Sequence, residues 1–442
     1  MKFYNRTSEL AELKRIQNLS FNENSRLTVV TGRRRIGKTS LIMKAVEQTP
    51  TIYLFVGRKN EASLCAEFIP QIKAALDCYV PDEIITFGSL FRYLMELSQA
   101  MGKWFNLVID EFQEFYSINE SVYSDMQNIW DQYRKRTRVN LIVSGSIYSL
   151  MQKIFQNSKE PLFGRADNII KLSAFDLTTL KEIMHDYDAA YSNDDLLALY
   201  TFTGGVPKYV ELFCDNVPLK VESMIEFMIR ENSSFIDEGK HLLIEEFGKN
   251  YATYFSILSA ISSGRNTQPE IESALGGKSI GGQIKRLIED YSIIARRRPI
   301  LAKEGTQAVR YEITDNFISF WFNYFDRYRS MIEIKNFVGL QKIVKSDYPT
   351  YSGRTLELYF KQQFAESYDY RDIGSWWEPK GDQNEIDIVA LKLEKNKAMI
   401  AEVKRQRKNF KPELLAAKVE YIKTKLLAKY HIESVCLTLE DM

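Results

Sequence analysis

Short apolar runs alternate with amphipathic stretches along the first 175 residues. The apolar runs are rich in β-branched residues and lie at 27–31, 51–56, 105–109, 139–144 and 168–172. Helical spacing of apolar residues follows the second run, at 60–77 and 89–101. Runs without polar interruption are typical of strands that are buried on both faces. The pattern therefore predicts an α/β core in which a parallel sheet carries helices on both faces.

The first apolar run leads directly into a glycine-containing loop and then into a helical stretch. The loop reads G-x-x-x-x-G-K-T and consists of Gly32, Arg33, Arg34, Arg35, Ile36, Gly37, Lys38 and Thr39, followed by Ser40. Its glycines let backbone N–H groups curl around phosphate oxygens, and the helix N-terminus adds partial positive charge. Lys38 is expected to reach the β- and γ-phosphates, and the Thr39 hydroxyl to ligate Mg²⁺. Because strand, loop and helix occur in the required order, the segment predicts a site for ATP and Mg²⁺.

Two acidic residues end the third apolar run. Asp110 is expected to hold the Mg²⁺ ion through its water shell, and Glu111 to act as general base on the attacking water. The alternative is an Asp-Glu pair that caps the next helix. Lys38 and Glu111 are predicted catalytic residues of the first segment, together with Arg165 of the sequence PLFGR at 161–165.

Two further candidates for the γ-phosphate site follow. The fourth apolar run ends in Ser144-Gly145-Ser146, and P-loop ATPases with a catalytic Glu place such a strand between the P-loop strand and the Asp strand. Ser144 or Ser146 is expected to sense the γ-phosphate, the alternative being a helix N-cap at Ser146. Arg165 precedes the last run and is a candidate γ-phosphate contact or arginine finger, the alternative being a surface ion pair.

These motifs together resemble the archaeal-type ATPase family, in the STAND branch of the AAA+-like P-loop ATPases. The matching segments are FYNR at 3–6, GRRRIGKTSL at 32–41, LVIDEFQ at 107–113, VSGS at 143–146 and PLFGR at 161–165. The resemblance implies that Arg6, together with Glu9, borders the adenine. It also implies a helical lid after the core, in which Pro207 of the element TGGVP lies near the nucleotide.

The middle of the chain predicts a winged helix-turn-helix. Helical patterns at 249–263, 268–275 and 279–290 precede two strand-like segments at 292–297 and 309–313. Six cations near one tip form a candidate phosphate-contacting patch: Lys278, Lys285, Arg286, Arg296, Arg297 and Arg298. The alternative is a winged helix that contacts only protein. The aromatic run that follows, at 311–328, resembles the element after the winged helix in this family and is expected to pack in an interdomain core.

The C-terminal segment carries a different set of polar residues. Glu357 lies on a predicted helix, Asp387 on a predicted strand, and Glu402-Val403-Lys404 ends the next strand after a tight turn. This is the layout of the PD-(D/E)xK nuclease fold, although Ile386 stands where Pro often precedes the Asp. In such sites Asp387 and Glu402 would chelate Mg²⁺, Glu357 would complete the metal shell, and Lys404 would orient or deprotonate water. The segment also resembles the domain of unknown function that follows archaeal-type ATPases. The alternative is that these are solvated strand residues.

Composition limits the function less than the motifs do. The chain has 442 residues, 59 Lys plus Arg against 58 Asp plus Glu, and a net charge of +1, which excludes a uniformly basic coat. Residues 395–430 are nonetheless strongly basic, with Arg405, Arg407, Lys408 and Lys411 directly after the Glu-x-Lys. Four scattered cysteines, three histidines and no apolar run of about 18 residues favour a cytoplasmic protein without disulfides or a membrane span.

The predicted organisation is a P-loop core at 1–175, a helical lid at 176–240, a winged helix with the aromatic helix at 241–340, and a nuclease-like domain at 341–442. The leading hypothesis is an ATPase coupled to a DNA-directed, Mg²⁺-dependent nuclease domain, with DNA contacted by the winged helix and the basic C-terminal segment. The alternative is a STAND-type signalling switch in which ATP drives assembly of a homo-oligomer and the C-terminal domain binds a partner without cleavage.

Overall fold

The computed structural model describes all residues except 249–250, 304 and 379–383. The chain divides into two compact units, one of residues 4–173 and one that combines residues 1–3 with 174–442. The boundary between the two units, at 173–174, lies next to the expected end of the P-loop core at 175. The lid, the winged helix and the C-terminal segment, expected as three domains, pack together in the second unit.

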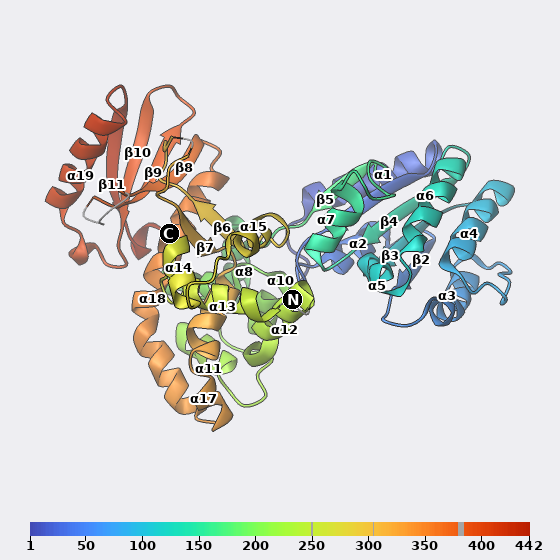
Figure 1. The fold of residues 1–442 in the computed structure, drawn as a ribbon, viewed down its shortest axis with the longest axis horizontal. Coiled ribbons are helices and arrows are strands. Elements are labelled where there is room, and N and C mark those ends of the chain that lie inside the picture. The colour runs from blue at the N-terminus through green and yellow to red at the C-terminus, as the bar shows by residue number, and fades with distance from the viewer. Residues whose placement is uncertain (249–250, 304, 379–383) are drawn as a thin grey trace. The chain divides into compact units, whose positions relative to one another are not determined.

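A five-stranded parallel sheet forms the centre of the first unit (Figure 1). Its strands are β1 (Arg26–Thr31), β2 (Thr51–Phe55), β3 (Trp104–Asp110), β4 (Arg138–Ser144) and β5 (Asn168–Lys171). Their order in the sheet is β2-β3-β4-β1-β5, so β4 lies between the P-loop strand and the Asp strand. The predicted strands, and the inserted position of β4, are confirmed.

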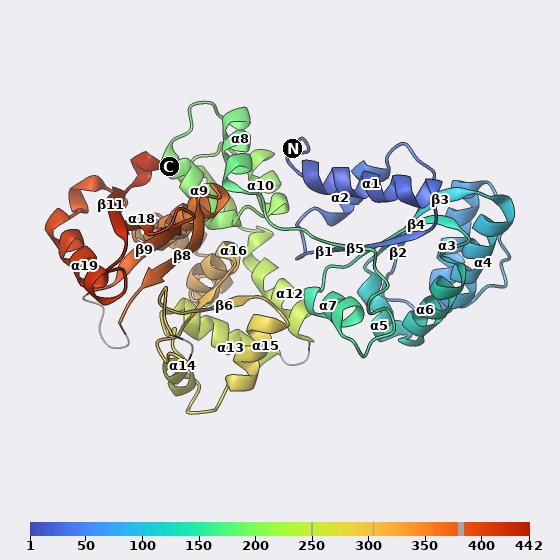
Figure 2. The same ribbon diagram turned by 90° about the horizontal axis from the view of Figure 1, so that it is seen from above.

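Helices cover both faces of this sheet, as the unbroken apolar runs predict (Figure 2). Helices α1 (Thr7–Asn22) and α2 (Lys38–Val46) lie on one face. The other face carries α3 (Glu61–Leu76), α4 (Phe87–Met101), α6 (Ser121–Tyr133) and α7 (Tyr148–Gln156). Alternate strand residues such as Leu27, Val29, Leu107 and Ile109 form one apolar core with these four helices. The intervening residues face α1 and α2, and among them the buried Asn106 accepts hydrogen bonds from Gln17 of α1 and from Asn140, both at 2.9 Å.

The second unit begins with helices in the segment expected to be the lid. They are α8 (Leu177–Tyr187), α9 (Asn193–Thr203), α10 (Pro207–Cys214), α11 (Val221–Met228) and α12 (Phe235–Phe247). Three helices and an antiparallel hairpin follow in the order of a winged helix: α13 (Tyr251–Ser262), α14 (Gln268–Ala274), α15 (Gly281–Glu289), β6 (Ile294–Arg297) and β7 (Arg310–Ile313). The predicted element order is therefore present.

The aromatic run packs in the interior of the second unit, as predicted. It forms α16 (Asn316–Phe320) and a π-helical turn, Trp321–Asp326. Phe317 contacts Tyr209 of α10 with ring centroids 4.5 Å apart, and Trp321 donates to the carbonyl of Ile236 in α12 at 2.7 Å. These contacts join the lid helices to the aromatic run, and Trp321 also contacts Phe255 of α13 with ring centroids 5.8 Å apart.

A four-stranded sheet ends the second unit. Its strands are β8 (Tyr370–Trp376), β9 (Ile386–Lys392), β10 (Lys397–Val403) and β11 (His431–Leu437), in the order β11-β10-β9-β8. The long helix α18 (Phe337–Glu366) precedes β8, and α19 (Pro412–Lys425) lies between β10 and β11. Strands β8, β9 and β10 pair antiparallel, whereas β10 and β11 pair parallel. The element order α-β-β-β-α-β places the ends of β9 and β10 beside α18.

Candidate functional site

Backbone geometry shapes the loop between β1 and α2. Gly32 has φ +145°, and a Cβ there would lie 2.8 Å from the carbonyl oxygen of Leu172, so only glycine fits. Gly37 has φ +88° and immediately precedes Lys38, the first residue of α2. The buried Lys38 Nζ donates to the carbonyl oxygens of Gly32 at 2.9 Å and Arg33 at 3.0 Å. These two bonds hold the ammonium group over the loop.

Asp110 accepts four hydrogen bonds at the end of β3. Its Oδ2 accepts from Thr39 Oγ1 at 2.7 Å and from the Tyr53 hydroxyl at 2.8 Å. Its Oδ1 accepts from Ser144 Oγ at 2.5 Å and from the Glu111 backbone N–H at 3.0 Å. Burial alone raises the pKa of Asp110, but these hydrogen bonds outweigh it and lower the pKa below its usual range. Asp110 is therefore a carboxylate next to a threonine hydroxyl, a pair of oxygen donors that fits Mg²⁺.

Glu111 is oriented by side chains from two other segments. Its φ of 54° turns the chain sharply after β3. Its Oε2 accepts from Gln113 Nε2 at 2.5 Å and from Ser146 Oγ at 2.7 Å. Both helix-capping alternatives are wrong. Glu111 precedes a short 3₁₀ helix without a side-chain cap bond, and Ile147, not Ser146, is the N-cap of α7.

The serines after β4 were proposed as γ-phosphate sensors, and the structure places both at the carboxylate pair. Ser144 holds Asp110 and Ser146 holds Glu111. Tyr53 was not predicted. The signal for it in the sequence is weak, since only its place in the strand beside β3 brings its hydroxyl to Asp110.

Arg6 lies against the P-loop. Its Nη2 donates to the carbonyl oxygens of Ser173 at 2.6 Å and Ile36 at 3.5 Å, and its Nη1 to Glu9 Oε1 at 3.3 Å. The Arg–Glu pair implied by the family resemblance is thus formed next to the loop. Its contact with adenine stays a prediction.

Arg165 lies near the amino-terminal ends of the sheet strands, whereas the γ-phosphate site lies at their carboxyl-terminal ends. Arg165 is therefore too far away to contact the γ-phosphate in its own chain. Its Nη2 pairs with Asp131 at 2.9 Å, and the nearby Asp167 N–H bonds the carbonyl of Leu27, near the start of β1. The P-loop begins at the other end of β1, roughly 15 Å away at about 3.3 Å per residue. The ion-pair alternative is therefore the correct one within this chain, and a role as arginine finger toward another copy stays a prediction.

Pro207 lies in the second unit, as the first residue of α10. The two preceding glycines have positive φ, and a Cβ on Gly205 would lie 2.7 Å from the carbonyl oxygen of Phe175. The Phe175 N–H donates to the Gly205 carbonyl at 2.9 Å, which fixes this turn against the start of the lid. Contact of Pro207 with nucleotide stays a prediction.

The C-terminal hairpin brings Asp387, Glu402 and Lys404 together. Lys404 Nζ lies 2.9 Å from Glu402 Oε1 and 3.9 Å from Asp387 Oδ2, so the two carboxylates share one side of the hairpin. Asp387 Oδ2 also accepts the Val403 N–H at 2.7 Å. Lys418 of α19, which was not predicted, bonds Glu402 Oε2 at 3.0 Å. Its signal in the sequence is only the general basic character of that helix.

The expected three-carboxylate metal shell is not assembled. Among the residues that the structure describes, no group of three His, Cys, Asp or Glu side chains is placed to hold a metal ion. Glu357 pairs instead with Lys361 at 3.9 Å. Burial, followed by the charge of Asp387, raises the pKa of Glu357 to about 7. The ammonium groups of Lys404 and Lys418 offset the charge of Glu402, so these carboxylates are stabilised without a metal ion. Asp387 and Glu402 alone have the donor chemistry of a Mg²⁺ site.

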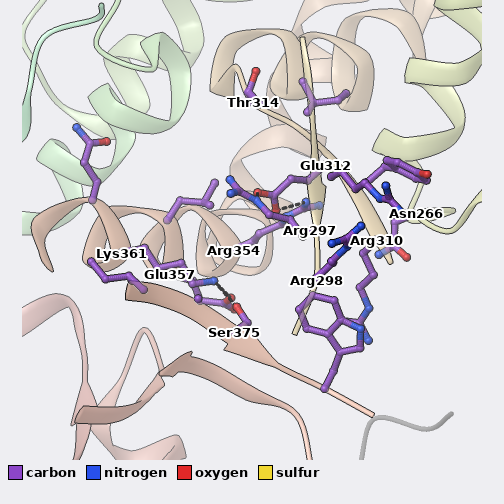
Figure 3. Close-up of a pocket in the computed structure, with 18 of the residues that line it drawn as sticks. Asn266, Arg297, Arg298, Arg310, Glu312, Thr314, Arg354, Glu357, Lys361 and Ser375 are labelled. Carbon is purple, nitrogen blue, oxygen red and sulfur yellow. Dashed lines mark hydrogen bonds and ion pairs between the residues drawn. The ribbon is translucent and has the colours of Figure 1, made fainter. Parts of the chain in front are cut away.

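The wing arginines line a cavity of about 820 Å³ (Figure 3). We call it the basic groove; its walls come from the β6–β7 hairpin, α18 and β8. The other three cations of the predicted patch do not line it: Lys278, Lys285 and Arg286 belong to the segment around α15. Lys285 pairs with Glu289 at 3.7 Å. The six cations thus separate into two sets.

No helix in the described part of the chain has the length and apolar character needed to cross a membrane.

Known proteins resemble this chain in both of its units. Residues 3–213 match the family described as an ATPase domain predominantly from Archaea, and residues 321–414 match one described as archaeal and bacterial proteins of unknown function. The uncharacterized protein MJECL04 of Methanocaldococcus jannaschii is 30% identical over 402 residues, which cover 89% of this chain and 86% of the relative. The Walker-type ATPase PABY2304 of Pyrococcus abyssi has a similar structure, with a TM-score of 0.55 and 18% identity over 73% of this chain and 96% of that one.

Proposed function

The chain belongs to the same family as MJECL04 and carries an archaeal-type ATPase domain, and we propose that its nucleotide state controls a DNA-directed nuclease site in the C-terminal segment. The chain is an ATPase, and its fold is that of Walker-type ATPases. The observation that supports the second activity is the shared contact of Lys404 with Glu402 and Asp387 at the ends of β10 and β9.

The nucleotide site has a separate residue for each requirement of phosphoryl transfer. The loop N–H groups and the Lys38 ammonium would bind the phosphate oxygens. Thr39 and Asp110 would hold Mg²⁺. When bound, this ion would neutralise part of the phosphate charge. Glu111 would accept the proton of the attacking water. Gln113 and Ser146 both donate to Oε2 of Glu111, so Oε1 would be the oxygen that accepts the proton.

At the C-terminal site, Lys404 is suited to bind charge rather than to abstract a proton. Burial lowers the pKa of Lys404, but the hydrogen bond to Glu402 and the charge of Asp387 outweigh this effect. The pKa of Lys404 therefore lies above its usual value. The group therefore remains an ammonium ion at neutral pH. It would bind the anionic phosphate or orient water, while Asp387 and Glu402 would hold the metal.

A second candidate function is a STAND-type switch, and one contact favours it. Arg405, directly after Lys404, forms an ion pair with Asp194 of the lid helix α9, in which Nη2 donates to both carboxylate oxygens at 2.8 Å. A movement of the lid would therefore act on the end of β10. This linkage would transmit lid movement to the C-terminal domain in the same way whether that domain binds a partner or cleaves DNA.

Incubation of plasmid and single-stranded DNA with the full-length protein tests both candidates. Cleavage is measured with and without ATP and Mg²⁺, for wild type, Asp387→Asn and Asp372→Asn. We expect Asp387→Asn to abolish metal-dependent cleavage and to retain ATP hydrolysis. Asp372 is an exposed carboxylate of β8 in the same sheet and serves as the matched control. If wild type hydrolyses ATP but cuts no DNA under any condition, the nuclease proposal fails and the switch is the better account.

A further inference from the structure

The basic groove has an unusual concentration of cations for a cavity inside one compact unit. Among the described residues, six cationic side chains line it, namely Arg296, Arg297, Arg298, Arg310, Arg354 and Lys361. Three acidic side chains of the described residues do so: Glu312, Glu357 and Glu385. The cations come from the wing on one side and from α18 on the other (Figure 3). A ligand in this cavity would meet positive charge from two directions.

The acids of the groove neutralise some of these cations but not all. Glu312 pairs with Arg297 and lies 3.6 Å from Arg354. Glu385 pairs with Arg310 at 2.6 Å. Arg296 and Arg298 are exposed and form no ion pair with any described residue. The wing therefore presents two arginines whose charge is left for a ligand.

The floor of the groove connects to the C-terminal carboxylates. Lys361 Nζ donates to Ser375 Oγ at 2.7 Å, and Ser375 Oγ donates to the backbone carbonyl of Asp387 at 2.9 Å. Glu357 also lines this part of the groove, and the nearby charge of Asp387 contributes to its raised pKa. Ser375 and Glu357 of the cavity lining therefore adjoin Asp387, which does not itself line the cavity.

We propose that the basic groove binds the phosphodiester backbone of a single-stranded nucleic acid and leads it to Asp387, Glu402 and Lys404. This inference rests on the proposed function, because it names the substrate of that site. Sites for single strands are positively charged grooves that follow the backbone. The volume of about 820 Å³ is in the range of small-ligand pockets, about 300–1,000 Å³, and suits a few nucleotides rather than a duplex.

The wing would then serve the groove instead of reading a duplex. Its arginines face α18 and β8 across the cavity, and the Arg310 guanidinium lies 4.7 Å from the centre of the Trp377 ring. Lys285 of α15, the recognition helix of a winged helix, and Lys278 just before it do not line this surface. If the wing arginines bind the nucleic acid, replacing Arg296 and Arg298 weakens binding. If the cations near α15 bind it, replacing Lys278 and Lys285 weakens binding instead.

Fluorescence anisotropy with labelled 12-nucleotide probes distinguishes the two sets. The probes are single-stranded DNA, RNA of the same sequence, and the duplex, measured with full-length protein in EDTA so that no metal-dependent cleavage occurs. The test variant is Arg296→Ala/Arg298→Ala, and the matched control is Lys278→Ala/Lys285→Ala. For the test variant we expect at least about tenfold weaker single-strand binding, since two charge-assisted contacts are lost. Its salt slope should fall by about 1.4, at roughly 0.7 per phosphate contact.

Each outcome decides the inference. Loss in the test variant with an unchanged control supports the groove, and the DNA and RNA arms identify which strand it takes. Preferential duplex binding, or loss only in the Lys278/Lys285 control, overturns it in favour of the recognition helix. Absence of single-strand binding by wild type also overturns it. ATP hydrolysis and cleavage, assayed in the same preparation, test the proposed function separately from this result.

Discussion

Three charged side chains of the nucleotide site are each held by defined partners. Asp110 accepts four hydrogen bonds, Glu111 accepts two from side chains, and Lys38 donates to two loop carbonyls. Such pre-orientation means that little reorganisation is needed when phosphate charge develops. Substitutions at these positions should therefore affect binding and turnover in different ways.

Replacement of Lys38 by Ala should weaken ATP binding by at least about tenfold, because a charge-assisted contact with the phosphates is lost. Titration calorimetry with a non-hydrolysable ATP analogue measures this change. Lys44→Ala is the matched control, since Lys44 is an exposed lysine of the same helix that pairs with Glu47. Equal affinities for wild type and Lys38→Ala would exclude the assigned role.

Replacement of Glu111 by Gln should preserve ATP affinity and lower turnover by about 10²- to 10⁴-fold, the usual contribution of a general base. Single-turnover hydrolysis, with binding measured in parallel, separates these two effects. Glu114→Gln, in the short 3₁₀ helix that follows Glu111 and paired with Arg58, should hydrolyse ATP like wild type. A Glu111→Gln protein with the wild-type rate would show that another group activates the water.

At the level of elements, the tip of β4 determines whether the carboxylate pair is correctly oriented. Ser144 and Ser146 reach Asp110 and Glu111 because the residue between them is glycine. A Cβ on Gly145 would collide with the side chains of Gln113 and Met151. Gln113 in turn donates to Glu111.

Gly145→Ala should therefore destabilise the first unit by about 1–3 kcal/mol, as overpacking of a close contact does. It should also slow ATP hydrolysis, because Gln113 is displaced from Glu111. Chemical denaturation and turnover measure the two effects. Gly57→Ala is the control, since a Cβ there would have only an ordinary contact, 3.9 Å from Phe55. A Gly145→Ala protein as stable and active as wild type would contradict this account of the turn.

The lid and the C-terminal sheet are joined by a compact polar network. Arg405 pairs with Asp194 of α9, bonds Ser352 of α18, and lies 5.1 Å from the Tyr348 ring centre. The Tyr348 hydroxyl donates to Asp194 Oδ1 at 3.0 Å. One arginine thus links three elements that lie far apart in the sequence.

Arg405→Ala should reduce the free energy of unfolding by about 1.5–3 kcal/mol, the typical contribution of hydrogen bonds to charged groups. Arg407→Ala is the control: its pair with Asp441 is more exposed and should contribute only about 0.2–1 kcal/mol. Urea denaturation compares the two variants. A similar small loss in both would mean that the Arg405 network does not join the lid to the sheet energetically.

Over the whole molecule, the nucleotide site and the C-terminal carboxylates lie in different compact units. At an ATP concentration of about 100 times Kd, binding should stabilise the wild type by about 2.7 kcal/mol. Asp387→Asn should show the same ATP-dependent rise in Tm, whereas Lys38→Ala should show at most about half of it, because tenfold weaker binding leaves about 1.4 kcal/mol. Thermal denaturation with and without ATP tests this, and loss of the rise in Asp387→Asn would show that the two sites do not fold and bind independently.

The sequence by itself determined the features that depend on local order and periodicity. A strand followed by G-x-x-x-x-G-K-T and a helix can form only one kind of loop, so Lys38 and Thr39 were assigned from their spacing. Apolar runs that end in Asp110 and Ser144 placed both residues at the carboxyl edge of a parallel sheet, where they meet. Two-residue alternation likewise placed Glu402 and Lys404 on one side of the hairpin.

Only the tertiary structure decided the features that depend on contacts between distant segments. Arg165 follows a motif-like sequence but lies at the opposite edge of the sheet, because the strand after it starts beside the start of β1. Lys418 and Lys361 lie on helices whose packing no periodicity specifies, yet they neutralise the carboxylates that were expected to bind metal. The basic groove exists because the wing packs opposite α18 and β8. Such pairings arise from burial of apolar faces over long sequence separations, so a linear pattern does not encode them.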